Sequence, residues 1–314
     1  MAEEEANKLI DSCMETADHY DRDLFSAHAE GTDLSNLNRR ISAGDDSAGA
    51  DAQDPTGELR IAPETARLID ESLIWRERTR GAFSPALGAV ISLWNFGGDP
   101  PGPVPNEKNI NEALSHTDAS GIHVTRSGND PGTARIRIDD PRLLIDLGGI
   151  AKGYIADRMK EQLTAGGVTS AVINLGGNVL LIGAHPDGSD FRIGIRDPKV
   201  REEENTDNSP LLTIPVRDQS VVTSGIYERY FIENGVRYHH VLDPETGCPA
   251  DTGLASVTIL SGDSTTGDAL STACLVLGQE KGQALIESLP GVEALFVSTD
   301  GVISSTPGFP KSLN

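Results

Sequence analysis

The sequence has few aromatic residues and no long apolar run. Phe, Trp and Tyr make up 4% of the chain against 37% hydrophobic residues in all, so a buried core has to be mainly aliphatic. The longest apolar clusters are short, such as 179–182, far below the ~18 apolar residues of a membrane-spanning helix. Residues 1–5 are acidic and no apolar stretch follows, which argues against a signal peptide. We expect no membrane segment and a cytoplasmic protein, or an exported one if the N-terminus is shortened.

Positive charge is also scarce. The chain has 26 basic and 48 acidic residues, a net charge of −22, and only seven of the basic residues are Lys. A protein that binds nucleic acid irrespective of sequence needs a basic surface, so we expect no nucleic-acid partner. The acidity fits either an ordinary acidic protein or one adapted to high salt, where repulsion between charges is screened.

Cysteine is too rare for a disulfide framework or a thiolate metal site. Cys13, Cys248 and Cys274 are odd in number and share no redox or metal-binding spacing, so we interpret them as free thiols.

The hydrophobic pattern alternates between helices and strands. Helices are expected over 3–24, 63–80, 151–163, 267–277 and 281–289. Strands are expected over 122–124, 134–138, 143–145, 171–173, 179–182, 191–195, 211–216, 220–223, 237–242, 254–260 and 294–297. Segments 42–57 and 97–103 have loop composition. With no repeat and no linker, the sequence predicts one α+β unit over residues 1–314, with a mixed or antiparallel sheet and flanking helices.

A glycine turn joins an expected strand to an expected helix. The strand ends at Asp146, Gly148 and Gly149 allow a tight turn, and Lys152 stands in the first turn of the helix. A helix N-terminus with an adjacent glycine turn and a lysine suits an anion such as phosphate. The same pattern also fits a tight turn followed by a surface lysine.

Two oxygen-bearing side chains lie four residues apart near the start of a later helix. Asp268 and Thr272 therefore share a helical face and could together hold one hard cation. Such a pair also serves as a capping device.

Adjacent histidines precede a turn that contains Pro244. The strand expected over 237–242 directs His239 and His240 to opposite faces, so we expect one to be structural and the other to be catalytic or ligand-binding. Ser224 lies in a Thr-Ser-Gly turn, but no nucleophile elbow surrounds it.

In their order along the chain, these segments resemble one family, the FAD:protein FMN transferases of the ApbE family. The resemblance covers nearly the whole chain. The matching segments are 25–26, 34–38, 81–85, 93–97, 146–153, 174–178, 223–225, 238–247 and 268–272.

The resemblance implies a Mg²⁺-dependent transferase that takes FAD as substrate, attaches FMN to a threonine of an acceptor flavoprotein as a phosphoester, and releases AMP. It also implies that Mg²⁺ is held by the Gly149 carbonyl and the side chains of Asp268 and Thr272. His240 corresponds to the family's active-site histidine, with Asp268 as the other candidate base. Contacts to FAD are expected from six residues: Asn38, Ser84, Asp146, Lys152, Ser224 and Leu242. A bound cation and Lys152 would let so acidic a protein accept a pyrophosphate.

Two departures from the family pattern stand out. The family's N-terminal strand with its Met-Gly-Thr element has no counterpart, and Ser84 stands where the family usually has Asp. Two other functions are compatible with the residues: an FAD pyrophosphatase, in which water replaces the threonine hydroxyl, and a non-catalytic FAD-binding protein. The joint presence of Asp268, Thr272 and His240 argues against passive binding, which needs no metal pair. The two enzymes share metal and leaving group and are not separated by the sequence.

Overall fold

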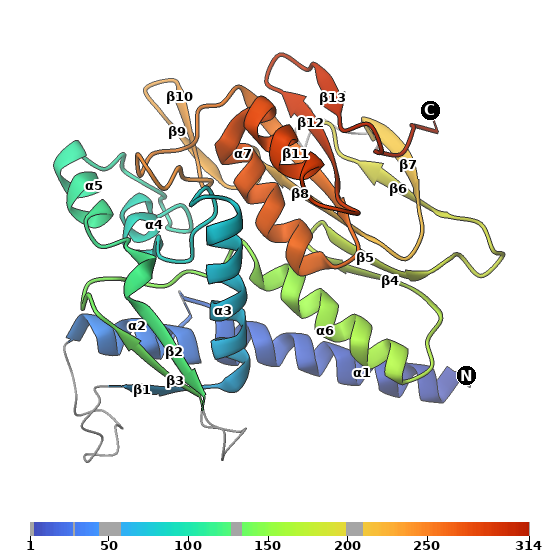
Figure 1. The fold of residues 1–314 in the computed structure, drawn as a ribbon, viewed down its shortest axis with the longest axis horizontal. Helices are drawn as coiled ribbons and strands as arrows, with labels where there is room; N and C mark the ends of the chain where they lie inside the picture. The colour runs from blue at the N-terminus through green and yellow to red at the C-terminus, as the bar shows by residue number, and fades with distance from the viewer. Residues whose placement is uncertain (1–2, 28, 44–57, 127–133, 199–209, 314) are drawn as a thin grey trace. The chain divides into compact units, whose positions relative to one another are not determined.

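The computed structural model describes residues 3–27, 29–43, 58–126, 134–198 and 210–313 (Figure 1). The chain groups into two compact units. The first comprises Met1–Ala17, Lys152–Glu228 and Ala250–Asn314, and the second comprises Asp18–Ala151 and Arg229–Pro249. The expectation of a single domain over 1–314 stays a prediction.

A six-stranded sheet forms the centre of the first unit. Its strand order is β13-β12-β11-β8-β5-β4, and every neighbouring pair is antiparallel. The strands are β4 (Ser170–Leu175), β5 (Asn178–Gly183), β8 (Ser220–Gly225), β11 (Leu254–Ser261), β12 (Glu293–Ser298) and β13 (Ile303–Ser305). All eight residues of β11 are buried. Its run of apolar and small residues therefore fits a strand covered on both faces.

Different elements cover the two faces of this sheet. The helix α7 (Ser264–Glu287) packs on β8 and β11. Against the other face lies the ribbon of β6 (Phe191–Ile195) and β7 (Leu212–Val216). The core on that face is aliphatic: Leu181, Ile195, Ile214, Val216, Val221, Leu260, Leu295 and Val297, with Phe309. The low aromatic content of the sequence is thus matched in this core.

Two further helices belong to the first unit. In Figure 1, α1 (Glu3–His19) runs along α6 (Ala151–Ala165). The Thr16 hydroxyl bonds the Gln162 side chain at 3.0 Å, and Gln162 donates to Ser12 at 2.7 Å. The expected helix is therefore present, but its buried side is centred on Cys13, while Ile10 and Met14 are both 52% exposed.

The second unit holds a small sheet and several helices. The strands β1 (Leu59–Ile61), β3 (Ala134–Ile138) and β2 (Ile122–Arg126) pair antiparallel in that order. The antiparallel strands β9 (Tyr230–Glu233) and β10 (Val236–His239) form a separate ribbon. The helical elements are a π-helical turn (Tyr20–Phe25), α2 (Asp33–Ala43), α3 (Pro63–Arg78), α4 (Gly88–Trp94), α5 (Glu107–Leu114) and a 3-10 turn (Ala119–Gly121).

The expected α+β class with an antiparallel sheet is confirmed, and two expected strands are wrong. Residues 143–145 are buried or half-buried but form no strand, because the Ile145 backbone bonds the Asn38 side chain and the Leu144 carbonyl bonds Gly88. The strand expected over 237–242 ends at His239. The break expected between two late helices is a kink inside α7, where Gly278 has φ 76° and ψ 175°. Most of the loop expected over 42–57 lies outside the described residues.

None of the described helices is both long and apolar enough to span a membrane. The segment 97–103 has no helix or strand, as its proline and glycine content predicts.

Candidate active site

The start of α6 and the start of α7 are joined by reciprocal hydrogen bonds. Asp157 on α6 accepts from the backbone N–H groups of Ser264 and Thr265, each at 2.8 Å, and from the Thr265 hydroxyl at 2.5 Å. Asp268 on α7 accepts from the Gly153 N–H on α6 at 2.9 Å. The first N–H groups of a helix have no partner within the helix, so each carboxylate satisfies groups that the other helix leaves open.

The two helices approach closely because residue 153 is glycine. A Cβ at this position would lie 2.3 Å from the Ser264 carbonyl oxygen and 2.8 Å from the Thr265 Cα, both of them backbone atoms. Any side chain would therefore push α7 away from α6. In the segment 146–153, Gly148 and Gly149 allow the turn, whereas Gly153 allows this contact between the two helices.

The pKa of the Asp157 carboxyl group differs from that of an exposed carboxyl group. Burial raises the pKa of its carboxyl group, and the hydrogen bonds from Thr265 and Ser264 oppose that effect only in part. Asp263 adds to the rise through charge repulsion, because it caps the same helix end by accepting from the Thr266 N–H at 2.8 Å. Two carboxylates thus lie at the beginning of α7.

Asp268 and Thr272 lie on the second and third turns of α7, on one face of the helix. The Asp268 side chain is buried, with 3% of its surface exposed, and its Oδ2 is the atom that bonds Gly153. Within the described residues no group of three His, Cys, Asp or Glu side chains could hold a metal. The donor set of one carboxylate and one hydroxyl suits Mg²⁺, which usually takes one or two carboxylates together with waters and substrate phosphates.

Small residues on β8 set the close packing of α7. The Ser220 hydroxyl donates to Ser264 at 3.0 Å, and the Ser224 hydroxyl bonds Ser271 at 2.7 Å. These residues alternate along the strand, so they share the face covered by α7. Ser224, expected to contact FAD, therefore has its hydroxyl next to the helix that carries Asp268, and its contact with FAD stays a prediction.

In the second unit, Asn38 fixes the backbone just before Asp146. Its amide donates to the Ile145 carbonyl at 2.8 Å and accepts from the Ile145 N–H at 2.9 Å. The Asp146 N–H bonds the Pro85 carbonyl at 2.8 Å, and the Asp146 carboxylate accepts from Gly148 N–H at 2.9 Å. The structure thus brings Asn38 and Asp146, with the neighbour of Ser84, into one polar region of this unit. Their contacts with FAD stay predictions.

The glycine turn follows directly. Gly149 lies in the turn of residues 148–150, and α6 begins at Ala151. Lys152 is exposed in the first turn of that helix, as the sequence predicts. The described structure therefore confirms the turn and helix start, while the roles of Gly149 and Lys152 stay predictions.

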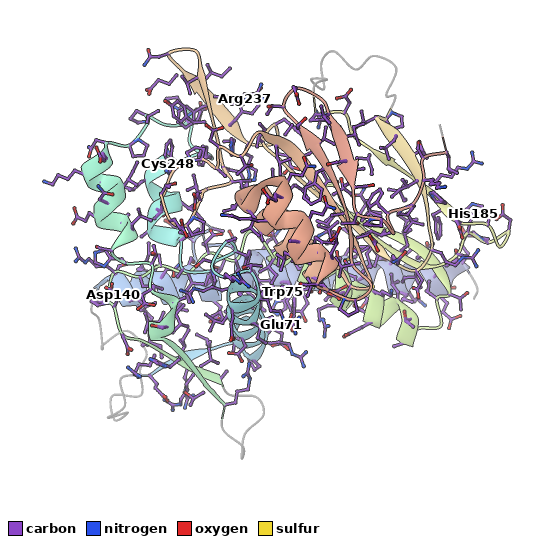
Figure 2. The ribbon with its side chains drawn as sticks, turned by 45° about the horizontal axis from the view of Figure 1, so that its top comes forward. Glu71, Trp75, Asp140, His185, Arg237 and Cys248 are labelled. Atoms are coloured by element: carbon purple, nitrogen blue, oxygen red, sulfur yellow. The ribbon has the colours of Figure 1, made fainter. Side chains whose placement is uncertain are left out.

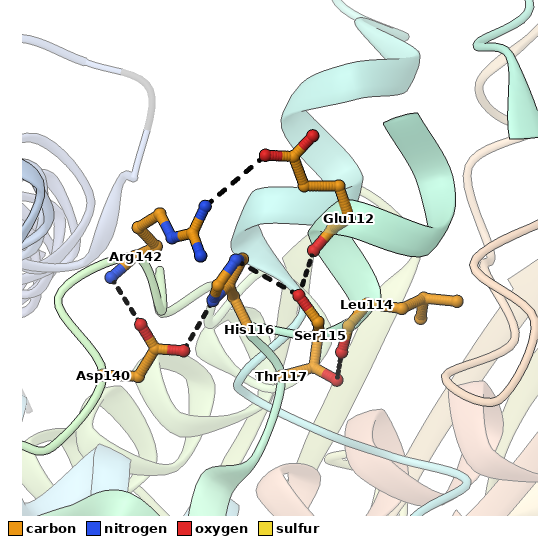
Figure 3. Close-up of polar contacts among 7 residues, drawn as sticks. All are labelled: Glu112, Leu114, Ser115, His116, Thr117, Asp140 and Arg142. Carbon is orange, nitrogen blue, oxygen red and sulfur yellow. Dashed lines mark hydrogen bonds and ion pairs between the residues drawn. The ribbon is translucent and has the colours of Figure 1, made fainter. Parts of the chain in front are cut away.

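A further polar cluster anchors the beginning of the same segment (Figure 3). His116 Nδ1 and the Asp140 carboxylate are 2.6 Å apart, and Asp140 also accepts from the Arg142 N–H at 2.9 Å. Burial would raise the pKa of Asp140, but the hydrogen bonds from His116 and Arg142 outweigh it and hold that pKa below its ordinary value. The cluster fixes the turn that leads into residues 143–146.

The strand expected to carry both histidines ends between them. His239 ends β10 and is 6% exposed, whereas His240 lies in the bend beyond the strand and is half-buried. The His240 N–H donates to the Arg229 carbonyl at 3.0 Å, and His240 Nδ1 lies 3.2 Å from the same oxygen. Because a carbonyl oxygen only accepts, a hydrogen bond between these two atoms requires the tautomer that carries its proton on Nδ1.

Leu242 is part of the core of the second unit. It is 5% exposed and packs with Leu87, Val90, Trp94 and Phe231. The Trp94 indole N–H donates to the Gly247 carbonyl at 2.8 Å, which fixes the turn after the histidines. Any contact of Leu242 with FAD would thus involve its backbone, and it stays a prediction.

Asp157 was not among the residues expected from the sequence. The available signal is its position: it lies on the buried side of α6, between Ala156 and Met159, where a charged residue needs a partner. The partner itself, the start of α7 more than 100 residues later, is known only from the fold.

Similarity to known proteins identifies the class. A family model described as "ApbE family" matches residues 3–296. A curated FAD:protein FMN transferase from Treponema pallidum is 41% identical over 275 residues, 84% of this chain and 74% of that protein. A crystal structure of an ApbE protein from Thermotoga maritima has a TM-score of 0.81 at 31% identity, covering 96% of this chain and 90% of that one. The flavin transferase ApbE from Vibrio cholerae gives a TM-score of 0.76 at 26% identity, covering 98% and 90%.

The fold and these similarities place the chain in a class of α+β enzymes. More narrowly, it belongs to the ApbE family.

Proposed function

We propose that the protein transfers FMN from FAD to a threonine side chain of an acceptor flavoprotein, with Mg²⁺, and releases AMP. The curated relatives are FAD:protein FMN transferases, which supports flavin transfer to a protein. The observation that carries the metal-dependent part is the Asp268–Thr272 pair on α7, with one Asp268 oxygen held by the Gly153 N–H.

The bonds of the reaction follow from the substrate. The threonine oxygen forms a bond to the phosphorus of the FMN half, and the bond from that phosphorus to the bridging oxygen breaks. AMP leaves with the bridging oxygen and its electron pair, and the threonine proton passes to a base. When bound, Mg²⁺ supplies positive charge at the pyrophosphate, and Asp268, Thr272 and the Gly149 carbonyl are the residues we propose to hold it.

The protein's own groups have separate tasks. Lys152, at the start of α6, adds positive charge for the phosphates of FAD. His240, with its Nδ1 proton bonded to the Arg229 carbonyl, presents Nε2 as the proton acceptor. Asp268 is the other candidate base. We propose FAD contacts from Asn38, Ser84, Asp146, Ser224 and the Leu242 backbone.

The test incubates the protein with FAD, Mg²⁺ and a candidate acceptor flavoprotein, and reads in-gel flavin fluorescence together with AMP release. Covalent fluorescence on the acceptor, lost when its target threonine is changed to alanine, is the expected result. AMP and free FMN without a labelled acceptor would instead identify an FAD pyrophosphatase. If FAD binds but no AMP is released, with or without the acceptor, the protein is a passive FAD binder.

A further inference from the structure

The β9–β10 ribbon is an isolated two-stranded element of the second unit. Within the described residues, neither strand pairs with any other strand. Asn234 and Gly235 close its tip with φ of 51° and 79°, the backbone that a tight hairpin turn requires. At its base, His240 bonds the Arg229 carbonyl. The proposed base is therefore the first residue after this ribbon.

The two faces of the ribbon have different surroundings. Phe231 and Tyr238 are opposite each other, stack with ring centroids 5.4 Å apart, and pack against Trp94. Residues alternate between faces along a strand, so Tyr230, Ile232, Arg237 and His239 lie on the other face. His239 is buried at the base of the ribbon, so we give the name outer face to Tyr230, Ile232 and Arg237. Ile232 is 57% exposed, although it is a large apolar residue.

One side chain of the outer face is held in place before any partner binds. The Arg237 guanidinium lies over the Tyr230 ring, 4.4 Å from its centroid, and Figure 2 shows Arg237 on this ribbon. A stacked arginine loses less conformational freedom when a partner binds. Tyrosine and arginine are among the residue types that contribute most to protein–protein binding.

The outer face carries a charge opposite to the net charge of the chain. Of its three residues only Arg237 is charged, whereas the whole chain has a net charge of −22. Arg237 therefore offers an acidic partner an attractive contact on a protein whose net charge repels it.

We propose that the outer face of Tyr230, Ile232 and Arg237 docks the acceptor flavoprotein through an acidic segment next to its target threonine. The inference rests on the proposed function. A threonine that reaches His240 brings its own chain to the base of the ribbon, and strands of this length extend only ~13 Å beyond it. Arg237 precedes His240 by three residues and pairs with Ile232, so the acceptor's surface near the threonine lies within reach of both side chains.

The test measures FMN transfer as a function of acceptor concentration for Ile232→Asp and Arg237→Glu. Two controls introduce the same acidic residues elsewhere: Val302→Asp, at a valine that is 60% exposed, and Arg192→Glu, at an exposed arginine on the β6–β7 ribbon. The ribbon variants should raise the KM for the acceptor at least ~10-fold, with FAD affinity by calorimetry and kcat at saturating acceptor unchanged. Equal KM values in ribbon variants and controls would overturn the proposal.

A second measurement keeps docking separate from catalysis. A short fluorescent peptide with one threonine between pairs of aspartates is titrated with each variant without FAD, and the same peptide with lysines serves as its charge control. If the aspartate peptide binds wild type and binds Arg237→Glu more weakly, docking is supported even if transfer itself is not observed. Equal binding of the peptide to wild type and Arg237→Glu would contradict the proposal. A wild-type dimer in sedimentation that Ile232→Asp dissociates would also contradict it, because the outer face would then join two copies of this chain.

Discussion

Asp157 and Asp268 each cap the helix that carries the other. Asp157 on α6 accepts from the first N–H groups of α7, and Asp268 on α7 accepts from the Gly153 N–H of α6. The orientation of the Asp268 carboxylate is therefore fixed by a second helix and not only by its own rotamer. A carboxylate held in this way needs little reorganisation to act as the cation ligand that we propose.

Removing Asp157 should destabilise the first unit. Asp157→Ala leaves the Ser264 and Thr265 N–H groups without their acceptor, so we expect the free energy of unfolding to fall by at least ~2 kcal/mol. Urea unfolding followed by circular dichroism measures this change. Glu161→Ala, at an exposed position of the same helix, is the control and should change stability by less than ~0.5 kcal/mol. Similar losses for both variants would show that the cap contributes little.

The pH dependence of stability should have opposite signs at Asp157 and Asp140. The folded-state pKa of Asp157 is raised above its ordinary value of 3.8, so the ionised group costs stability, and the advantage of wild type over Asp157→Asn should shrink as pH rises from that value through the folded pKa. The folded-state pKa of Asp140 is lowered, so the advantage over Asp140→Asn should be full above 3.8 and disappear as pH falls through the folded pKa. Urea unfolding of the three proteins between acid and neutral pH checks both signs, and parallel curves would contradict them.

The sequence predicts local elements better than the contacts between them. Period-2 and helical patterns locate β6 and α6 to within about two residues, because they depend on neighbours in the chain. They miss α4 and β9, which are short and owe their burial to each other's side chains, such as Trp94 and Phe231. The apolar residues Leu143 and Ile145 are buried and give the sequence pattern of a strand. Their segment is instead held by hydrogen bonds to the Asn38 side chain.

The candidate site shows the same division. Gly148, Gly149 and Lys152 are recognisable from one short segment, since a glycine turn before a helix is a local pattern. Asp157 is not recognisable, because its partners at 264 and 265 are brought to it by the packing of α7 on the sheet. The spacing of Asp268 and Thr272 indicates a shared face, but it does not reveal that Gly153 orients the carboxylate.

The charge of Asp268 should be essential for metal-dependent turnover. Asp268→Asn keeps an oxygen that can accept from the Gly153 N–H, but it removes the charge that we propose for Mg²⁺ binding. We expect turnover in Mg²⁺ to fall ~10³-fold or more with the fold retained. Asp263→Asn, the N-cap of the same helix, is the matched control, because asparagine caps as well as aspartate. Near-normal activity of folded Asp268→Asn would remove it from the metal site.

Lys152 should act on binding of FAD. Lys152→Ala removes a positive group at the start of α6, and we expect FAD affinity to fall by ~1.5–3 kcal/mol, the range for hydrogen bonds to charged groups. Isothermal calorimetry with FAD measures the difference. Lys160→Ala on the same helix is the control, since its amine pairs with Asp218 at 3.0 Å, and its FAD affinity should match wild type. Unchanged affinity of Lys152→Ala would leave the glycine turn with a structural role alone.

His240 should act on the transfer step itself. Formation of the threonine–phosphorus bond requires the hydroxyl proton to leave, and the bond between His240 Nδ1 and the Arg229 carbonyl directs the lone pair to Nε2. His240→Ala should bind FAD and Mg²⁺ as wild type does but transfer FMN at least ~10²-fold more slowly in single turnover at saturating FAD. His239→Gln, at the buried neighbour, keeps most of the side-chain volume and should transfer at a rate close to wild type once its folding is verified. Small and equal losses in the two variants would remove His240 from the chemistry and leave Asp268 as the candidate base. A larger loss in His239→Gln would mean that the base is the buried histidine, and the bend after β10 would then be only the connection to the following turn.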